Sequence, residues 1–363
     1  MVAIYTQMLN AGASATLPQI LGSGATATVY ATHMHDQGSN TSVQVAVKVF
    51  ARDYVETWQR EVRACGIIRE RAMLLHVDPP IIRMIRADGW VTYDCLVPSL
   101  QPCILYEYMG SDLSTMIRYQ RDEFGCGLPI VQTLQIGLDV AYALEFLHKC
   151  GIVHTDVKTG NVLLTHVCGE DEPAQYHAKL GDFGTSSLPG MTPDKNVGTV
   201  EYCAPEVTMA LPYGSGCDIW AFGCTLFRIA TLCHLFDVYD EDGCLLGHDD
   251  LPVPADDSAS AESSEPVRYR HMTLCFRMLG AAPKQFVQRC RKMFTSRGQP
   301  IDHPDIPIID QTAMLQEYGL DAYALVCMQH ILHMCIQWMP DKRAAAADIA
   351  AYISTQLDQP RQE

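Results

Sequence analysis

Residues 151–164 read GIVHTDVKTGNVLL, and this stretch carries three side chains suited to phosphate chemistry within one predicted loop. Asp156 can accept a proton from an attacking hydroxyl, Lys158 can neutralise a transferred phosphoryl group, and Asn161 can offer its side-chain oxygen to a magnesium ion. The apolar run 162–164 follows directly. These residues indicate a phosphoryl-transfer enzyme, a related protein that only binds, or a coincidence of common residue types. The rest of the chain has to distinguish the three.

The chain is long and apolar enough to bury a substantial core, with 363 residues of which 48% are hydrophobic. One large domain or two coupled lobes would suit this length. Forty-two acidic and 26 basic residues give a formal net charge of −16. This charge argues against direct binding to nucleic acid or to an anionic membrane, whose phosphates would repel it, and is compatible with a basic protein partner. The composition does not indicate the oligomeric state.

Fifteen cysteines would suggest disulfides in a small secreted protein, but no Cys-x-x-Cys pair occurs and many cysteines fall inside apolar helical patterns. The first residues, MVAIYTQMLNAGASATL, lack the charged start and apolar block of a signal peptide. Residues 219–236 are apolar but are interrupted by Arg228 and His234, which favours a buried helix over a membrane span. We therefore expect reduced cysteines, no zinc site and an intracellular protein that is cytoplasmic by default, with room for an additional nuclear pool.

The order of patterns along the chain predicts a two-lobed α+β protein. Up to about residue 108, alternating apolar and polar positions predict strands such as QILGSGATATVYATHM and SVQVAVKVFA, with one helix at residues 51–75. A further strand is predicted in CILYEYMG, stopping at Gly110. The helical pattern that follows predicts a small β-rich lobe over 1–108 and a larger, mostly helical lobe over 109–363. Within the second lobe, residues 237–267 hold ten acidic residues and no lysine or arginine. We call this segment the acidic insert and expect it to be exposed.

Two segments of the predicted strands carry residues that could bind a nucleotide. In LGSGATATVY, Gly22 and Gly24 form a turn that either lets backbone N–H groups approach phosphates or only joins two strands. In VAVKVF, Lys48 lies mid-strand among apolar residues, where its charge needs compensation. It either reaches solvent at an edge or holds phosphates together with an acidic partner, for which Glu61 on the following helix is the best candidate.

A second candidate metal ligand lies 21 residues after Asn161, in the segment GDFG. There Asp182 stands on a turn shaped by Gly184. Magnesium takes oxygen ligands and keeps several waters, so one aspartate, one asparagine and nucleotide phosphates are enough to hold it. We therefore predict Asn161 and Asp182 as metal ligands.

In this order and spacing, the glycine turn, the strand lysine, the helix glutamate, Asp-x-Lys-x-x-Asn, Asp-Phe-Gly and APE at residues 204–206 resemble the protein-kinase signature over nearly the whole chain. The resemblance implies the bilobal protein-kinase fold, ATP and Mg²⁺ as cofactors, and transfer of the γ-phosphoryl group to serine or threonine of a protein substrate. It implies catalytic roles for Asp156 and Lys158. The nucleotide-binding positions that it implies are Leu21, Gly22, Gly24, Val29, Ala46, Lys48, Glu61, Glu107, Met109 and Leu163.

The resemblance also implies that the loop at 151–164 is the catalytic loop, and it assigns structural roles to residues outside this loop. Tyr106 would be the gatekeeper residue at the back of the adenine pocket. Asp218, in DIWAFGC, would brace the catalytic loop, and Arg343 would pair with Glu206 of APE.

Local matches are similar to the SR-protein kinases and the LAMMER (Clk-type) kinases of the CMGC group. Thr155 stands in HTD where His-Arg-Asp is common, and YVETWQREV, LYEYMG and HMTLCFRMLGAAPKQF resemble segments of SR-protein kinases. The acidic insert lies where the CMGC group carries its extra segment. This similarity implies basic, Arg/Ser-rich substrates. In GTVEYCAPE, however, Val200 and Cys203 stand where CMGC kinases usually keep arginines, so the preference for the residue after the target is not carried over.

Two hypotheses follow from these details. Because Thr155 replaces the arginine that normally binds a phosphorylated activation loop, a phosphate on Ser186, Ser187, Thr192 or Thr199 would lack that partner, and we expect activity without such phosphorylation. The acidic insert either attracts basic substrates or simply remains solvated.

The alternatives to an active protein kinase are a pseudokinase, which would be a scaffold or nucleotide-binding module on the same fold, and a kinase of small molecules. Pseudokinases typically lose the strand lysine, the catalytic aspartate or the metal aspartate, yet Lys48, Asp156, Asn161 and Asp182 are all present. APE and the CMGC-like insert argue against a small-molecule substrate. We therefore predict an active serine/threonine protein kinase.

Overall fold

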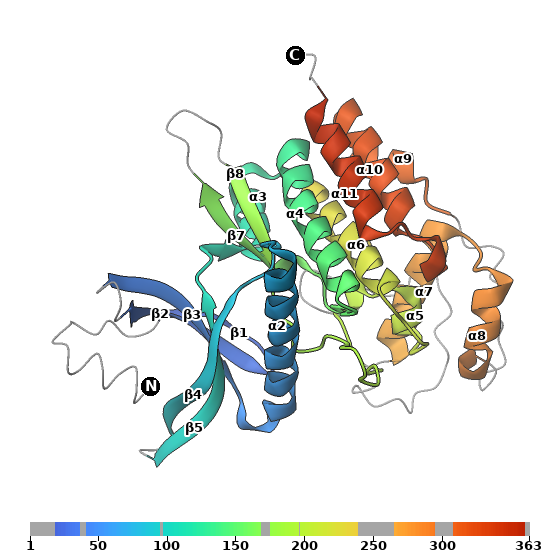
Figure 1. Ribbon diagram of the computed structural model, residues 1–363. Helices are drawn as coiled ribbons and strands as arrows, with labels where there is room; N and C mark the ends of the chain where they lie inside the picture. Colours follow the sequence, from blue (N-terminus) through green and yellow to red (C-terminus); the bar gives the residue numbers. More distant parts are fainter. Residues whose placement is uncertain are drawn as a thin grey trace.

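The computed structural model describes residues 19–36, 41–94, 97–167, 175–195, 197–238, 265–294 and 308–359. An antiparallel sheet and one long helix make up its N-terminal part, and a larger group of helices follows (Figure 1). The predicted α+β architecture is confirmed. Most of the acidic insert, residues 239–264, lies outside the described residues, so its predicted exposure is not tested.

The N-terminal sheet places Lys48 in its central strand. Its five strands are ordered β1-β2-β3-β5-β4. Register pairs Lys48 with Val29 on one side and with Ile104 on the other. The strands are β1 Gln19–Ser23, β2 Ala27–Asp36, β3 Thr41–Phe50, β4 Met84–Asp94 and β5 Val97–Glu107.

The two faces of β3 have different neighbours, because successive side chains of a strand point to opposite sides. Val45, Val47 and Val49 pack with residues of β5 in a small cluster on one face. Lys48 lies on the other face with Phe50, which belongs to the main core. Lys48 is therefore directed toward the helix that covers this face.

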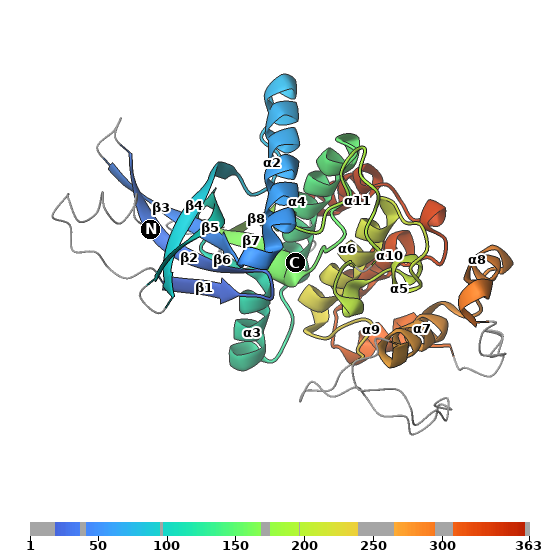
Figure 2. The same cartoon turned by 90° about the horizontal axis from the view of Figure 1, so that it is seen from below.

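Helix α2, Val55–Leu75, follows the short 3₁₀ helix η1, Arg52–Tyr54. Its buried residues, Glu61, Ala64, Cys65 and Ile68, recur at the spacing of one helix face. Both views place α2 between the sheet and the C-terminal helices (Figures 1 and 2). Glu61 is thus on the inner face of the helix, toward Lys48.

The C-terminal part is built around α4, half of whose residues are buried, and α6, which is buried along nearly its whole length. A small sheet of β6 Ser111–Asp112, β7 Val162–Val167 and β8 Gln175–Leu180 joins it to the rest. The 3₁₀ helices are η2 Thr159–Asn161, η3 Val200–Tyr202 and η4 Pro340–Lys342. The α-helices are α3 Leu113–Phe124, α4 Ile130–Lys149, α5 Pro205–Thr208, α6 Gly216–Thr231, α7 Glu265–Leu279, α8 Lys284–Phe294, α9 Gln311–Glu317, α10 Ala322–Cys335 and α11 Ala346–Asp358.

The apolar segment 219–236 forms most of α6, which is buried along nearly its whole length, as predicted for a core helix. Among the described helices, α4 alone is long and apolar enough to cross a membrane. Half of that stretch is buried, because α4 packs against α6, α11 and β8. The cysteines whose state is described are free thiols.

One predicted boundary is wrong. The strand read from CILYEYMG to Gly110 ends earlier, at Glu107. Glu107 makes the last register pair with β3, opposite Val45. The chain then leaves the large sheet and pairs Ser111 and Asp112 with β7 instead. The segment between the two sheets therefore connects them and is not a continuation of β5.

Candidate functional site

Lys48 is the centre of a buried network of ion pairs. Its Nζ atom lies 2.8 Å from Oε2 and 3.1 Å from Oε1 of Glu61, and 2.8 Å from Oδ1 of Asp182. Lys48 comes from β3, Glu61 from α2, and Asp182 from the segment after β8. The predicted partnership of Lys48 with Glu61 is therefore present. The alternative, a lysine reaching solvent at a sheet edge, is wrong because Lys48 is only 8% exposed.

The charges in this network shift one another's pKa values. Burial disfavours the charged form of Lys48, but the carboxylates of Glu61 and Asp182 outweigh it and hold the pKa of Lys48 above its ordinary value. Burial likewise opposes ionisation of Asp182, whose pKa nevertheless falls to about 2 because of Lys48. Lys48 and Asp182 are therefore charged at neutral pH.

Tyr106 makes a contact to the same network that the sequence did not predict. Its hydroxyl donates to Oε1 of Glu61 at 2.6 Å and lies 3.8 Å from Sγ of Cys65. Burial, then the charge of Glu61, raises the pKa of Tyr106 well above its ordinary value, so the phenol remains a donor. The assignment of Tyr106 as gatekeeper stays a prediction, but the residue also orients Glu61.

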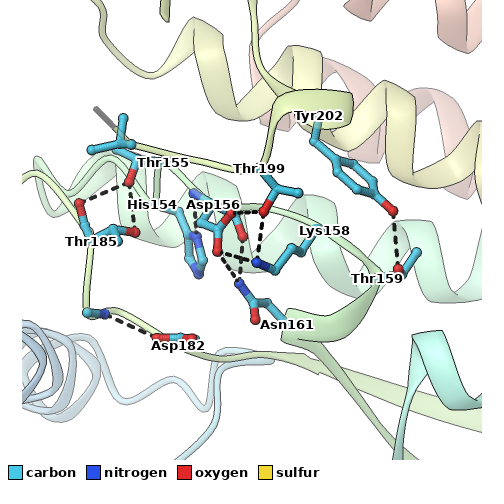
Figure 3. Close-up of polar contacts among 12 residues, drawn as sticks. His154, Thr155, Asp156, Lys158, Thr159, Asn161, Asp182, Thr185, Thr199 and Tyr202 are labelled. Atoms are coloured by element: carbon cyan, nitrogen blue, oxygen red, sulfur yellow. Dashed lines mark hydrogen bonds and ion pairs between the residues drawn. The ribbon is translucent and has the colours of Figure 1, made fainter. Parts of the chain in front are cut away.

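Lys158 and Asn161 of the opening motif both contact the carboxylate of its third residue, Asp156 (Figure 3). Nζ of Lys158 lies 2.8 Å from Oδ2 of Asp156. The Asn161 amide nitrogen donates to that same oxygen at 3.0 Å and to the Asp156 backbone carbonyl at 2.7 Å. Asn161 lies in η2, whose tight turn brings it back toward Asp156. The loop therefore fixes the Asp156 carboxylate with one cation and one amide.

Thr199 completes this arrangement, and sequence reasoning missed its place. Its hydroxyl donates to Oδ1 of Asp156 at 2.9 Å and accepts from Nζ of Lys158 at 2.8 Å (Figure 3). From the sequence, Thr199 is predicted only as a candidate phosphorylation position. Ser186, considered likewise, is 1% exposed and donates to the His154 carbonyl at 3.3 Å. For Thr199, the signal available in the sequence was a hydroxyl placed shortly before APE.

Asp218 of α6 holds the catalytic loop through hydrogen bonds to its backbone, as predicted. The Asp218 carboxylate accepts from the backbone N–H groups of His154 and Thr155, each at 2.8 Å, and lies 2.9 Å from Nε2 of His148. Burial opposes its ionisation, yet the bonds to His148 and to the loop keep the pKa of Asp218 below its usual range. Thr155 has a φ of 70°, an unfavourable value for a β-branched residue, so these bonds stabilise a strained turn.

The second predicted structural pair is also present. Nη1 and Nη2 of Arg343 donate to the two oxygens of the Glu206 carboxylate, at 2.6 and 2.8 Å. The two side chains are almost fully buried, so each charge depends on the other. The pair fixes α5, which carries APE, to the segment before α11.

Most of the remaining predicted nucleotide-binding residues lie in β1, β2, β3, β5 and β7. Gly24 lies between β1 and β2, and Met109 lies between β5 and β6. Two of these predicted residues have polar contacts of their own. The Glu107 carboxylate is 2.7 Å from Nζ of Lys179, and Sδ of Met109 accepts from Thr165 at 3.2 Å. Their role in nucleotide binding stays a prediction. These residues differ in burial. The exposed ones are Leu21, Gly22 and Gly24, and the half-buried ones are Val29, Ala46, Glu107 and Leu163. Met109 is buried.

The donor set fits magnesium. Asn161 uses its amide nitrogen on Asp156, which leaves the amide oxygen for another ligand. The hydrogen bonds of Asp182, from Lys48 and from the Gly184 N–H, are made at Oδ1. Among the described residues, no group of three or more His, Cys, Asp or Glu side chains could hold a metal ion by itself. Two oxygen donors suit a magnesium ion that takes its other ligands from phosphates and water.

The chain matches one family and resembles proteins from plants and a virus. The family described as the protein kinase domain matches residues 16–352. Serine/threonine-protein kinase Nek3 of Oryza sativa subsp. japonica is 35% identical over 163 residues, which are 42% of this chain and 24% of the relative. The serine/threonine-protein kinase US3 homolog of Cercopithecine herpesvirus 9 is 31% identical over 185 residues, 49% of this chain and 46% of the relative.

Serine/threonine-protein kinase AFC2 of Arabidopsis thaliana is 25% identical over a longer stretch of 271 residues, 69% of this chain and 55% of the relative. In each case the chain spans less than two thirds of the relative's own length.

Proposed function

The chain belongs to the protein kinase domain family, and from this we propose that it transfers the γ-phosphoryl group of ATP to serine or threonine side chains of protein substrates. The observation that carries the proposal is the Lys48 ammonium held between Glu61 and Asp182. It joins a lysine suited to phosphates with a carboxylate suited to magnesium. The relatives named above are serine/threonine-protein kinases, which supports the same activity.

Binding and orientation of ATP fall to the N-terminal part and to Asp182. An ammonium has three N–H donors. In Lys48 they are directed to the two oxygens of the Glu61 carboxylate and to Oδ1 of Asp182. We expect the ammonium to turn one of the donors shared by Glu61 toward the α- and β-phosphates when ATP binds. Asn161 and Asp182 would hold magnesium, which supplies charge neutralisation on the phosphates when bound. The glycine turn at 22–24 would cover the phosphates with backbone N–H groups.

The transfer step depends on Asp156 and Lys158. Asp156 orients the incoming serine or threonine hydroxyl and accepts its proton as the new oxygen–phosphorus bond forms and the bond to ADP breaks. Lys158, 2.8 Å from Asp156, offsets the charge that develops on the γ-phosphoryl group. Thr199 keeps the two in place, since its hydroxyl bonds to both. The chain's contribution is thus positioning and electrostatic stabilisation.

We propose further that the substrates are basic, Arg/Ser-rich proteins and that the kinase belongs to the CMGC group near the SR-protein and LAMMER kinases. The net charge of −16, the ten carboxylates of the acidic insert and the HTD sequence support this. A cytoplasmic location with a nuclear pool is part of the same proposal.

The test is transfer of labelled phosphate from ATP with magnesium to three peptides: an Arg/Ser repeat, a proline-directed peptide and an acidic peptide. Asp182→Asn is the matched control, because it removes one charge with little change in size. If the wild type transfers phosphate to the Arg/Ser peptide and Asp182→Asn does not, both the kinase activity and the substrate class are supported. Transfer only to another peptide supports the kinase and rejects the substrate class. No transfer to any peptide, with ATP still bound, rejects catalysis in favour of a pseudokinase.

A further inference from the structure

The segment between GDFG and APE is attached to α2 by side chains of the helix. We call residues 185–203 the activation segment. Nη1 of Arg60 lies 2.5 Å from Oδ2 of Asp194, and Nη2 of Arg63 donates to the Pro189 carbonyl at 3.4 Å. Close by, a Cβ at Gly184 would come within 2.7 Å of the Thr57 methyl group. One face of α2 therefore lies along the start and the middle of this segment.

Asp194 is held from two sides. Its carboxylate binds Arg60, and its backbone carbonyl accepts from the Tyr213 hydroxyl at 2.9 Å. The Arg60 side chain is 18% exposed and that of Asp194 48%, so the ion pair is partly shielded from water. Asp194 thus connects α2 with the segment that follows α5.

Arg60 directly precedes Glu61, the partner of Lys48. Any force that fixes Arg60 therefore also fixes the helical turn that carries Glu61. In many kinases a phosphate added to the activation loop orders it by binding an arginine. Here Arg60 on α2 is already paired with an anionic group of the same chain, the Asp194 carboxylate.

The catalytic loop also contacts the activation segment at Thr155. The Thr155 hydroxyl donates to the Thr185 carbonyl at 2.9 Å and lies 3.1 Å from its hydroxyl. Thr155 is the residue that stands in place of the arginine expected to bind a phosphate. A neutral hydrogen bond therefore joins the two segments at this position.

We propose that Asp194 and Arg60 are positioning residues, in which the Asp194 carboxylate takes the place of an activation-segment phosphate and its ion pair with Arg60 keeps Glu61 on Lys48. The inference rests on the proposed kinase function and specifies how that activity is maintained without phosphorylation. Asp194 and Arg60 do not contact the reacting atoms; they act through Glu61.

The experiment uses the full chain, treated with phosphatase and shown by mass spectrometry to carry no phosphate. Asp194→Asn and Arg60→Gln each remove one charge, the double variant removes both, and Arg60→Asp with Asp194→Arg exchanges them. Asp78→Asn, at an exposed carboxylate after α2, is the matched control. The readouts are kcat, the KM values for ATP and peptide, and the thermal unfolding midpoint.

The wild type is expected to keep its full kcat after phosphatase treatment. Each single variant lowers kcat about two- to fivefold, which is the range for a partly exposed ion pair. The double variant loses no more than either single variant, and the exchanged pair recovers most of the loss. The peptide KM and the unfolding midpoint change little, because the pair positions Glu61 and does not bind peptide. The control keeps wild-type kcat.

Three outcomes would overturn the proposal: wild-type kcat in both single variants, losses that multiply in the double variant, or loss of wild-type activity on phosphatase treatment. A wild type inactive before any treatment would instead reject the kinase function. A readout independent of catalysis then decides the inference, namely amide hydrogen exchange over residues 185–195. Exchange must be faster in Asp194→Asn than in the wild type and unchanged in Asp78→Asn. Equal rates would reject the ion pair as the element that orders the segment.

Discussion

Substitution of Thr199 tests whether phosphoryl transfer depends on the orientation of the Asp156 carboxylate. Replacing it with valine removes a hydroxyl bonded to Asp156 and Lys158 while keeping the branched shape. A hydrogen bond to a charged group is worth about 1.5–3 kcal/mol, so kcat should fall about ten- to hundredfold in Thr199→Val. Thr199→Ser keeps the hydroxyl and should retain most of the activity. Peptide phosphorylation rates measure both.

The alternative for Thr199 is a role as a phosphate acceptor. In that case Thr199→Ser would stay active only when phosphorylated, and phosphatase would abolish its activity. Equal kcat values for the valine and serine variants would show that neither role applies.

Substitution of Tyr106 tests whether its hydrogen bond to Glu61 contributes to ATP use. Tyr106→Phe removes the hydroxyl that donates to the Glu61 carboxylate and keeps the buried ring. Glu61 then loses one donor but keeps Lys48, so kcat/KM for ATP should fall about fivefold. Tyr142→Phe is the matched control, since Tyr142 is exposed on α4. An unchanged kcat/KM in Tyr106→Phe would mean that Lys48 alone orients Glu61.

The sequence revealed the residues of the site that lie in short motifs, and it missed contacts that depend on the fold. Asp156, Lys158 and Asn161 lie close together in one loop, so their proximity could be predicted. Thr199 lies 43 positions from Asp156, and Tyr106 lies 45 positions from Glu61. Neither separation matches a helical or strand period, and only the folded chain brings these side chains together.

At the scale of elements, α2 was predictable because its buried positions follow one helix face. The end of β5 was not, because it depends on a partner strand. The strand stops where register with β3 ends, at Glu107, although the apolar pattern continues. Propensity identified the elements, and pairing between distant strands determined where they stop.

Helix α7 carries a buried histidine that predicts a dependence of stability on pH. Nδ1 of His271 lies 3.1 Å from the Thr208 hydroxyl of α5. Its Nε2 is buried without a hydrogen-bond partner among the described residues. Burial lowers the pKa of His271 to about 4, because a second ring proton would have no acceptor. The folded protein therefore holds this residue neutral.

The unfolded chain binds a proton at His271 from about pH 6.5 downward, whereas the folded protein does so only near pH 4. The contribution to stability is complete above pH 6.5 and is lost as pH falls toward 4. Between pH 7 and pH 5, His271 should lower the free energy of unfolding by about 2 kcal/mol. Urea denaturation at both pH values measures it.

His271→Asn should reduce this pH dependence, because asparagine keeps a polar atom near Thr208 and does not titrate. Some dependence should remain from His234, whose pKa burial and Arg228 also lower to about 4. The same loss of stability between pH 7 and pH 5 in variant and wild type would contradict a neutral, buried His271.

At the scale of the molecule, the site forms where distant parts of the chain meet. Lys48 and Asp182 are 134 positions apart, yet one ion pair joins them. The α+β class could be predicted because strand patterns precede helical ones along the chain. The placement of α2 against the activation segment could not, since it depends on how the sheet packs against the helices.

Deletion of most of the acidic insert tests whether its charge attracts basic substrates to the whole molecule. Deleting residues 244–264 removes a block with five carboxylates from a chain whose net charge is already −16. If the insert attracts basic substrates, the KM for an Arg/Ser-repeat peptide should rise several-fold while kcat stays the same. The rise should be larger at low salt, since charges farther apart than about 10 Å are screened at 0.1 M salt.

A second variant separates the charge of the insert from its length. It keeps all residues of 244–264 but replaces each Asp with Asn and each Glu with Gln. If charge attracts the substrate, this variant should raise the KM as much as the deletion does, and neither should raise the KM of an acidic peptide. A rise in the deletion alone would assign the effect to length or to a direct contact. An unchanged KM in both, at low and at high salt, would mean that the carboxylates only keep the segment solvated, and that substrate choice depends on the site around Asp156.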